Sequence, residues 1–491
     1  MKKNKKEEGV MSDVQAIVLA AGQASRFRTE KTKLVEQICG QELIIYVTKL
    51  LESLSVPTTV VVGYQKELLM SVINQYHQNN ITFINQDNRH GTGHALKCTR
   101  EQWKSKYILV LNGDIPLLKP SLIEALYLEH TKTDSIFSFV TAHHNAPSSS
   151  YGRVIQDKHG IRIVEAHEFT MDPQEHCCIN AGVYIINREF LEHEIDNLEH
   201  NAQTKELYIV DLIRRANNDG CKITTISVPF DQVRGVNTLE ELWIAEQIKR
   251  SELVRYWMDL GVRFMSAHDT HLDLSVRIGT ASYIGADAHL LGNTILENHC
   301  HIAPFSIIEN SVIGAGSRVH GFSVIKNAQI GPNCDIGPFA HVQNTTIGHS
   351  SVVGNFVQTK QSHIGSNTKA KHHAYLGDAF IGNKVNIGAG TITCNHDGVT
   401  KHATTILDNA YIGSNNSLVA PIVIGANAFT AAGSVITKDV PDNALAIGRA
   451  HQINKLSYSN KINRNKNHTI GNDDQLVANA EKISKETIDS V

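Results

Sequence analysis

From residue 278 onward, an aliphatic residue recurs about every six positions and is usually followed by glycine. Ile278, Ile284, Ile330 and Ile336 follow this rule, and the last run begins at Ile412. A period of six fits neither an α-helix nor simple strand alternation, but it is typical of a parallel β-helix. Each hexapeptide would supply one short strand and one corner, with the aliphatic side chain pointing inward. Because one coil cannot bury its own core, we expect many coils to stack into a solenoid.

The first half of the chain has a different pattern, in which short apolar runs alternate with segments of helical character. Residues 14–19, 58–62 and 107–111 read as strands, and residues 44–54 read as a helix. This alternation predicts a mostly parallel sheet covered by helices, which is an α/β architecture.

These patterns divide the chain into five segments. We expect a disordered tail at 1–12, an α/β domain at 13–239 and a charged amphipathic linker helix at 240–260. A repeat domain at 261–456 would be followed by a second polar tail at 457–491, whose composition indicates disorder.

Composition narrows the class of protein. The chain has 491 residues, of which 41% are hydrophobic and 19% charged, as expected for a globular protein of two or three domains. Its net charge of −3 gives no reason to expect a nucleic-acid partner. No apolar stretch is long enough to span a bilayer, and residues 1–9 lack the apolar core of a secretory signal. The eight cysteines contain no CxxC pair, which favours a reduced, cytoplasmic compartment.

Two short segments of the first half carry candidate chemistry. The small-residue loop at 19–25 directly follows a strand, so its backbone N–H groups could approach a phosphate or a nucleobase. Asn112-Gly113-Asp114 follows another strand, at the sheet edge where ligands bind in open α/β sheets, and a carboxylate there suits Mg²⁺. Taken singly, each has a plainer interpretation. The loop matches neither a Walker motif nor GxGxxG, and the aspartate could simply close a turn.

Further motifs follow in order along the chain. The first half contains Gln86, Gly91-Thr92-Gly93-His94-Ala95, Tyr151-Gly152-Arg153, Val164-Glu165, Asn180-Ala181-Gly182 and Gly235-Val236-Asn237, and the repeat half adds 354–357, 374–378 and 386–395. Together with the loop and the strand-end motif, they resemble one family over residues 13–455. It is the family of bifunctional N-acetylglucosamine-1-phosphate uridyltransferase and glucosamine-1-phosphate acetyltransferase enzymes.

The resemblance implies a fold, two reactions and an assembly. The fold would be a Rossmann-like nucleotidyltransferase domain followed by a left-handed parallel β-helix of hexapeptide repeats. The repeat domain would acetylate glucosamine 1-phosphate with acetyl-CoA. The first domain would then transfer UMP from UTP to N-acetylglucosamine 1-phosphate, releasing pyrophosphate and UDP-N-acetylglucosamine, a precursor of cell-envelope polysaccharides. The family's acetyltransferase sites lie between subunits, so a homotrimer is also implied.

The resemblance also implies roles for individual residues in uridyl transfer. Asp114 and Asn237 would hold Mg²⁺, while Arg26 and Lys33 would neutralise phosphate charge. The other nucleotide-binding and sugar-binding residues would be Leu19, Ala20, Ala21, Gly22, Gln86, Gly91, Thr92, Asn112, Gly113, Gly152, Glu165 and Asn180. Because this reaction displaces one phosphate by another, we expect catalysis by positioning and charge neutralisation.

Acetyl transfer requires a base, because an ammonium group cannot attack a thioester, and histidine titrates near neutral pH. The resemblance places this base at His372. Neighbouring strand residues point to opposite sides, so only one of His372 and His373 is expected to face the amine. The sugar phosphate would be bound by Gln343, Lys360, Tyr375 and Asn386, and acetyl-CoA by Ala389, Asn395, His396, Ser414, Ala432 and Arg449. An insertion at 391–406 interrupts the repeat, and such insertions often carry binding residues.

Several residues depart from the family pattern. Gln343 stands where the family has a sugar-phosphate-binding arginine, and His396 stands where it has a tyrosine. Lys371 replaces a glycine beside the proposed base, and Ala24 and Asn112 replace a glycine and a tyrosine in the first domain. The lost charge at Gln343 makes the uridyltransferase half the closer match. The main alternative is a monofunctional sugar-1-phosphate uridyltransferase with a non-catalytic, trimerising solenoid, and a non-catalytic scaffold is a more distant one.

Overall fold

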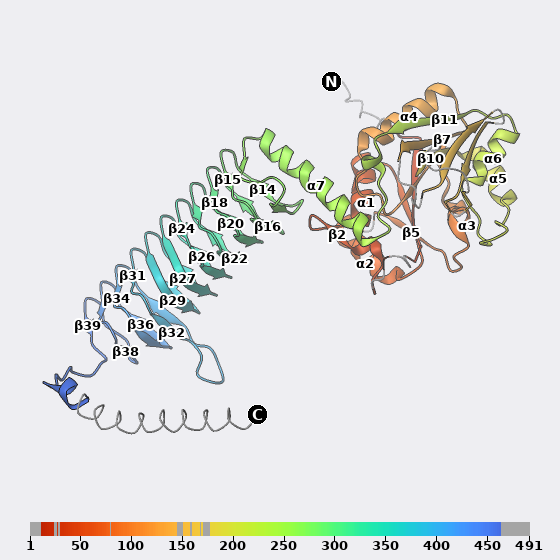
Figure 1. Cartoon of the computed structure of the whole chain (residues 1–491). Coiled ribbons are helices and arrows are strands. Elements are labelled where there is room, and N and C mark those ends of the chain that lie inside the picture. The colour runs from red at the N-terminus through yellow and green to blue at the C-terminus, as the bar shows by residue number, and fades with distance from the viewer. Residues whose placement is uncertain are drawn as a thin grey trace, which may run out of the picture.

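The computed structural model describes residues 11–23, 27, 30–78, 80–144, 151–157, 160–166, 168–169 and 177–462. An N-terminal α/β body and an elongated solenoid are connected by one long helix, α7 (Leu239–Asp259) (Figure 1). Most of the two predicted tails, 1–12 and 457–491, lies outside the described residues.

The α/β body contains a nine-stranded sheet whose main path has the order β11-β7-β10-β6-β1-β4-β5. The strands are β1 (Val14–Ala20), β4 (Thr58–Val62), β5 (Thr82–Asn85), β6 (Tyr107–Asn112), β7 (Phe137–His143), β10 (Cys178–Asn187) and β11 (Ile223–Val228), with β8 (Arg153–Asp157) and β9 (Gly160–Val164) attached to β10. On the main path, β10 is antiparallel to both of its neighbours and the other pairs are parallel. The predicted mostly parallel sheet is therefore confirmed.

Helices pack on both faces of this sheet (Figure 1). One face is covered by α1 (Leu43–Ser53), α2 (Lys66–His77) and α4 (Pro120–Thr133), and the other by α3 (Gly91–Cys98), α5 (Arg188–Glu194) and α6 (Asp211–Asn218). Alternate residues of β1 enter the two cores, because a central strand of such a sheet is buried on both sides. The remaining short elements are η1 (Lys33–Val35), β2 (Gln37–Ile38), β3 (Gln41–Glu42), η2 (Arg100–Gln102), η3 (Ile195–Asn197) and η4 (Phe230–Val233).

The solenoid has three strands in a typical coil, and one of them joins a nine-stranded parallel sheet. This sheet contains β14 (Arg277–Ile278), β17 (Ile295–Leu296), β20 (Val312–Ile313), β23 (Gln329–Ile330), β26 (Thr346–Ile347), β28 (His363–Ile364), β30 (Ala379–Ile381), β33 (Thr404–Ile406) and β36 (Ile422–Ile424). The inward aliphatic residue of each strand is buried, as the hexapeptide pattern predicts.

The other two strands of each coil belong to a 19-stranded sheet, because β27 and β29 bend round a corner and pair on both sides of it. Its strands are β12 (Arg263–Phe264), β13 (His271–Leu272), β15 (Tyr283–Ile284), β16 (His289–Leu291), β18 (His301–Ile302), β19 (Ile307–Glu309), β21 (Arg318–Val319), β22 (Val324–Lys326), β24 (Asp335–Ile336), β25 (His341–Gln343), β27 (Val352–Lys360), β29 (Lys369–Gly377), β31 (Asn386–Ile387), β32 (Ile392–Cys394), β34 (Tyr411–Ile412), β35 (Ser417–Val419), β37 (Phe429–Thr430), β38 (Val435–Ile436) and β39 (Leu445–Ala446). Together the two sheets form the left-handed parallel β-helix predicted from the sequence.

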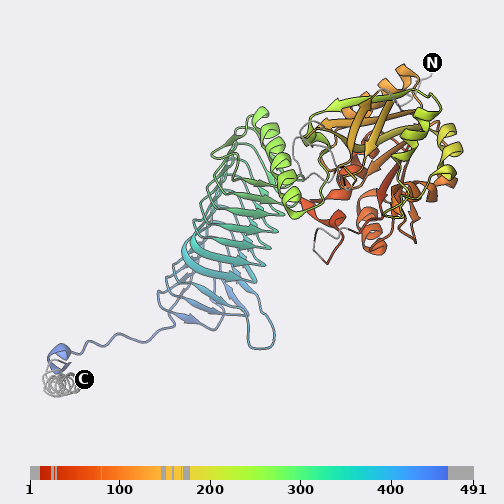
Figure 2. The same cartoon turned by 45° about the vertical axis from the view of Figure 1, so that its right-hand side comes forward.

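Most coils of the solenoid take 17 or 18 residues and the last takes 16, as the separations of residues paired between neighbouring coils show. The separation rises to 25 where the insertion between β32 and β33 enlarges one coil. This insertion projects from the solenoid as a long loop (Figure 2).

An exposed row of stacked aromatic rings follows one corner of the solenoid. Phe305, Phe322, Phe339 and Phe356 each lie one coil apart, with ring centroids separated by 4.9 to 5.2 Å. Each ring is about half exposed, at 46 to 57%. We call these four residues the phenylalanine column. They adopt positive φ values of 55 to 59°, so each side chain leaves the backbone at a left-handed corner.

Helix α7 joins the two bodies through its buried residues. Thr238 caps its first turn and forms a capping box with Glu241. Ala245 packs in a cluster of the α/β body with Ile38, while Val254 and Trp257 belong to the solenoid core. The helix is therefore packed against both bodies rather than suspended between them.

Candidate functional site

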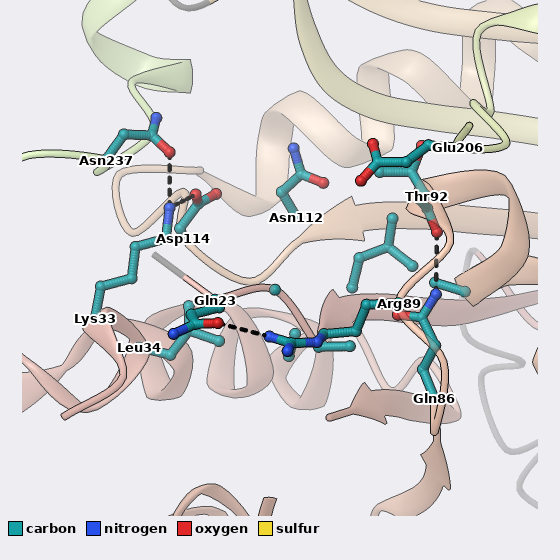
Figure 3. A pocket seen from close by; sticks show the side chains of 16 residues that line it. Gln23, Lys33, Leu34, Gln86, Arg89, Thr92, Asn112, Asp114, Glu206 and Asn237 are labelled. Atoms are coloured by element: carbon teal, nitrogen blue, oxygen red, sulfur yellow. Dashed lines mark hydrogen bonds and ion pairs between the residues drawn. The ribbon is translucent and has the colours of Figure 1, made fainter. Parts of the chain in front are cut away.

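A cavity of about 600 Å³ opens at the carboxyl edge of the parallel strands. It lies where the register pairs Leu19 at the end of β1 with Asn112 at the end of β6. The lining residues are Leu19, Ala20, Ala21, Gly22, Gln23, Lys33, Leu34, Gln86, Arg89, Gly91, Thr92, Ala95, Asn112, Asp114, Glu206 and Asn237 (Figure 3). The loop after β1 and the turn after β6, which are far apart in the sequence, therefore line the same space.

Two oxygen ligands converge at one side of this cavity. Lys33 Nζ lies 2.5 Å from Asp114 Oδ2 and 2.7 Å from Asn237 Oδ1 (Figure 3). Asp114 follows β6, and Asn237 lies just before α7, so the start of the linker helix helps to build the site. Within the described ranges, no cluster of three or more His, Cys, Asp or Glu side chains is arranged to hold a metal ion.

The opposite end of the cavity is formed by Gln86 and the start of α3. Gly91 begins the helix with φ +90°, and a Cβ there would lie 2.5 Å from the Leu207 carbonyl oxygen. Only glycine fits this approach without strain. The Gly93 N–H donates to the same carbonyl at 2.8 Å, which anchors the first turn of α3 to the segment before α6.

A second cavity of about 210 Å³ adjoins the first, and the two share Leu19, Thr92, Asn112, Asp114 and Asn237. Its own lining includes Gly152, Glu165 and Asn180, together with Tyr151, Tyr184 and Tyr208. Asn180 Nδ2 donates to the Tyr184 hydroxyl at 2.7 Å. Burial raises the pKa of Tyr208 to about 12 and also raises the pKa values of Tyr151 and Tyr184, so these hydroxyls keep their protons near neutral pH.

Nearly all residues that the sequence suggested for the first domain line one of these cavities. Gly113 is the exception. Its N–H donates to the Leu19 carbonyl at 3.0 Å, and a Cβ there would lie 2.9 Å from Ile44, so its small size serves packing. Arg26 lies outside the described residues. Arg89, Gln23 and the three tyrosines were not among the suggested site residues, and only the proximity of Arg89 to Gln86 along the chain signals its position.

In the solenoid, His372 lies directly above Asn355 of the previous coil. The two residues are in register between β27 and β29, and His372 Nδ1 is 2.9 Å from Asn355 Oδ1. Since the amide oxygen can only accept, Nδ1 carries the proton and Nε2 is left with a lone pair when the ring is neutral. Asn355 was not among the suggested site residues.

The next residue, His373, is separated from His372 by a corner rather than by regular strand alternation. Its φ is +32°, and the register places it one coil above Phe356. His373 therefore continues the line of the phenylalanine column, and the expectation of simple alternation does not describe this pair. Both histidines are exposed.

Lys360 and Gln343 belong to one row of outward-facing residues. The register aligns Lys326 with Gln343 and Gln343 with Lys360 on successive coils. Gln343 therefore lies between two lysines, of which Lys326 pairs with Glu309 at 2.8 Å. Tyr375 of β29 lies in register with Gln358 of β27, one coil away. Asn386 lies on β31, in register with Lys369 of β29.

The residues suggested for acetyl-CoA form a column at another corner. The Asn415 N–H donates to the Ala389 carbonyl at 2.7 Å, and the Gly433 N–H donates to the Ser414 carbonyl at 2.8 Å. Ala389, Ser414 and Ala432 thus occupy successive coils, and a Cβ at Gly433 would lie 3.8 Å from the side chain of Arg449.

Asn395 and His396 begin the inserted loop. Asn395 Nδ2 donates to Asp378 Oδ2 at 2.5 Å and lies 3.4 Å from the Tyr375 hydroxyl, which ties the loop to the strand that carries His372. His396 Nδ1 accepts from the Gly398 N–H at 3.1 Å, and the loop is closed further by Asp397 and His402 at 2.7 Å.

All eight cysteines are unpaired. Among the helices of the described segments, none is long and apolar enough to cross a membrane.

Comparisons with known proteins support the division into two functional halves. Residues 16–168 match the family model of the MobA-like NTP transferase domain. A bifunctional protein GlmU of Geotalea uraniireducens is 35% identical over 459 residues, which cover 92% of this chain and 100% of that protein. Those of Clostridium botulinum and Thermosipho melanesiensis are 35% and 38% identical over 452 residues, covering 91% of this chain and 98% and 97% of those proteins.

The similarity therefore spans both halves in one continuous order, as the sequence motifs predicted. It favours two enzymatic activities over the monofunctional alternative and confirms the predicted nucleotidyltransferase and acetyltransferase. The chain belongs to the GlmU family of bifunctional enzymes, which acetylate glucosamine 1-phosphate and transfer UMP to the acetylated product.

Proposed function

We propose that uridyl transfer takes place across the two adjoining cavities of the α/β body. The nucleobase of UTP would lie against Gln86 and the start of α3, and N-acetylglucosamine 1-phosphate would fill the smaller cavity beside Glu165 and Asn180. The phosphates would then meet where the cavities join. The observation that carries this proposal is that Asp114 and Asn237 line both cavities.

The donor set fits Mg²⁺ as the metal of this site. Asp114 and Asn237 offer one carboxylate and one amide oxygen that approach a common point, now contacted by the Lys33 ammonium. Mg²⁺ is commonly held by one or two protein oxygens, with water and substrate phosphates completing the shell. When bound, the ion would neutralise the negative charge that develops on the phosphates.

The residues of the chain would accomplish the transfer mainly by positioning. An oxygen of the sugar phosphate attacks the α-phosphorus of UTP, and the bond to the departing pyrophosphate breaks. Lys33 can stay in contact with the phosphates during the transfer because its ammonium contacts Asp114, which lines both cavities. The small residues of loop 19–22 allow its backbone to approach the phosphates closely. The small cavity would hold the attacking phosphate in line through contacts to its sugar.

We further propose that His372 is the general base of acetyl transfer. Asn355 holds the Nδ1 proton, so Nε2 is the atom that would accept a proton from the ammonium group of glucosamine 1-phosphate. The free amine then attacks the thioester carbonyl of acetyl-CoA, and the thiol of CoA leaves. Lys360, Gln343, Tyr375 and Asn386 would bind the sugar phosphate, and Ala389, Asn395, His396, Ser414, Ala432 and Arg449 would bind acetyl-CoA.

We propose a homotrimer as the working assembly. The phenylalanine column supports this proposal, because a row of half-exposed rings beside the corner of His372 favours contact with another copy. The proposed substrates UTP and acetyl-CoA and the unpaired cysteines support a cytoplasmic location.

Replacing Asp114 tests the uridyltransferase site. Asp114→Ala removes the only carboxylate proposed for the metal, so pyrophosphate release should fall about a hundredfold or more. Mn²⁺ binding followed by electron paramagnetic resonance should weaken in parallel. Acetyl transfer in the same preparation serves as the control and should be unchanged. Near-normal uridyl transfer by this variant would refute the metal assignment.

Paired histidine variants test the base. His372→Ala should reduce CoA release from acetyl-CoA and glucosamine 1-phosphate by ~10²–10⁴-fold, because the amine keeps its proton. His373→Ala is the matched control and should have a far smaller effect, and neither variant should change uridyl transfer of N-acetylglucosamine 1-phosphate. If His373→Ala were the more damaging change, the base would have to be moved by one residue.

The row of lysines around Gln343 predicts a gain in affinity. Gln343→Arg places a third cation between Lys326 and Lys360, where a phosphate could form a charge-assisted hydrogen bond. The KM for glucosamine 1-phosphate should fall about tenfold, as a bond to a charged group allows. Gln329→Arg makes the same change on a different strand series and should leave this KM unaltered. An equal effect of both variants would show that general charge, not the row, is responsible.

Variants of the phenylalanine column test the assembly. Phe322→Asn and Phe339→Asn remove the rings but retain a residue that tolerates positive φ, so the coils should remain folded. Sedimentation should show dissociation of the trimer at higher protein concentration than for the unmodified chain, with loss of acetyl transfer before uridyl transfer. Phe380→Asn changes an exposed ring outside the column and provides the control. A fully active monomer would rule out this assembly.

A further inference from the structure

Behind the end of the larger cavity proposed for the nucleobase, a histidine that has no role in the reactions described above contacts the lining residue Gln86. His94 lies in the first turns of α3, and its Nδ1 is 3.0 Å from Gln86 Nε2. The same amide nitrogen donates to the Gly91 carbonyl at 3.1 Å. Gln86 is 4% exposed, so these two contacts account for both hydrogens of a buried amide group.

The two contacts determine which atom of Gln86 is left for a ligand. No donor among the described residues bonds to Gln86 Oε1, and the side chain lines the cavity (Figure 3). Beside it, the first N–H groups of α3 at Gly91 and Thr92 have no intrahelical acceptor. This end of the cavity therefore offers a side-chain acceptor next to backbone donors.

That order of groups is complementary to uracil rather than to cytosine. Uracil presents an N3–H donor next to its O4 acceptor, whereas cytosine presents an N3 acceptor next to its N4 amino donor. With Gln86 Oε1 directed to the base, the N3 acceptor of cytosine would face another acceptor. A turned amide would reverse the match, because its NH₂ group would then face the base.

We propose that His94 is a positioning residue that holds the Gln86 amide in this orientation and thereby sets the preference for uracil over cytosine. This inference rests on the proposed uridyltransferase function. A neutral imidazole with its lone pair on Nδ1 accepts from the amide nitrogen and keeps Oε1 toward the cavity. A protonated ring donates from both nitrogens, so it would bond to Oε1 and turn the amide.

The surroundings of His94 favour the neutral ring. Burial lowers its pKa below the ordinary 6.5, and repulsion from other cationic groups acts in the same direction. Cys98 Sγ lies 3.9 Å from both ring nitrogens, and burial raises the pKa of this thiol, so it stays uncharged. The titratable groups around the ring are His90, Lys97 and Cys98 on or beside α3, His200 before α6, and Asp87, which acts on Cys98. Selectivity for uracil should therefore be strongest near neutral pH and weaken as the pH falls through the pKa of His94, which lies below the ordinary 6.5.

The test compares UTP with CTP in pyrophosphate release with N-acetylglucosamine 1-phosphate and Mg²⁺. In His94→Leu, the amide loses its acceptor, and the ratio of kcat/KM for UTP to that for CTP should fall about tenfold. The loss should appear in KM for UTP, with kcat retained at saturation, since the reacting phosphates are untouched. His94→Asn restores an acceptor near the position of Nδ1. This variant should recover the preference and make it independent of pH, which a merely structural role would not predict.

His90→Leu is the matched control, because His90 belongs to the same group of rings, with centroids 5.4 Å apart, but has no bond to Gln86. It should leave the UTP-to-CTP ratio unchanged. An active His94→Leu enzyme with the original ratio would overturn the role of His94 alone. Should that variant not fold, the unmodified enzyme decides, because a ratio that stays constant across the pH range in which His94 itself titrates, as followed by NMR, would also overturn the inference. Failure of the unmodified enzyme to release pyrophosphate from UTP would instead refute the proposed function.

Discussion

Register between parallel strands is the constraint on which both candidate sites depend. In the α/β body, the pairing of β1 with β6 sets Leu19 beside Asn112, so two distant segments reach the same edge of the sheet. In the solenoid, the same type of pairing sets His372 above Asn355 and Gln343 between two lysines. Strands hydrogen-bonded in this way lie ~4.8 Å apart, which brings residues one coil apart within reach of each other.

The balance of charge in the larger cavity explains why a metal suits the proposed reaction. Asp114 and Lys33 pair closely, with side chains only 16% and 13% exposed, so together they add little net charge. Two substrates that carry several phosphate charges need more positive charge than this pair supplies. Arg89 lies at the cavity wall, held by Gln23 at 3.1 Å, and together with Mg²⁺ would supply it.

The solenoid combines a structural and a chemical role in the same repeat. Its inward aliphatic residues form one continuous core, while outward residues on consecutive coils form rows. Gln343, at a position where the resemblance implies an arginine, is uncharged, yet both of its neighbours in the row are lysines. Loss of the charge at position 343 therefore leaves Lys360 beside a phosphate near Gln343, whereas Lys326 on the other side is already paired with Glu309.

The sequence by itself determined the two architectures, since inward aliphatic residues every six positions and alternating strand and helix patterns follow from burial alone. Nearly every residue that its motifs suggested for the first domain lines one of the two cavities, whereas other lining residues, such as Arg89, Tyr184 and Tyr208, were not suggested. The tertiary structure alone decided which other side chains hold the proposed site residues in position. Asn355 beneath His372 depends on the length of one coil, and the corner at His373 replaces the expected strand alternation. The acceptor for the Gln86 amide depends on how α3 turns after Gly91. Such contacts join residues whose proximity arises from register and helix geometry, and no pattern of hydrophobic and polar positions encodes a hydrogen bond between them.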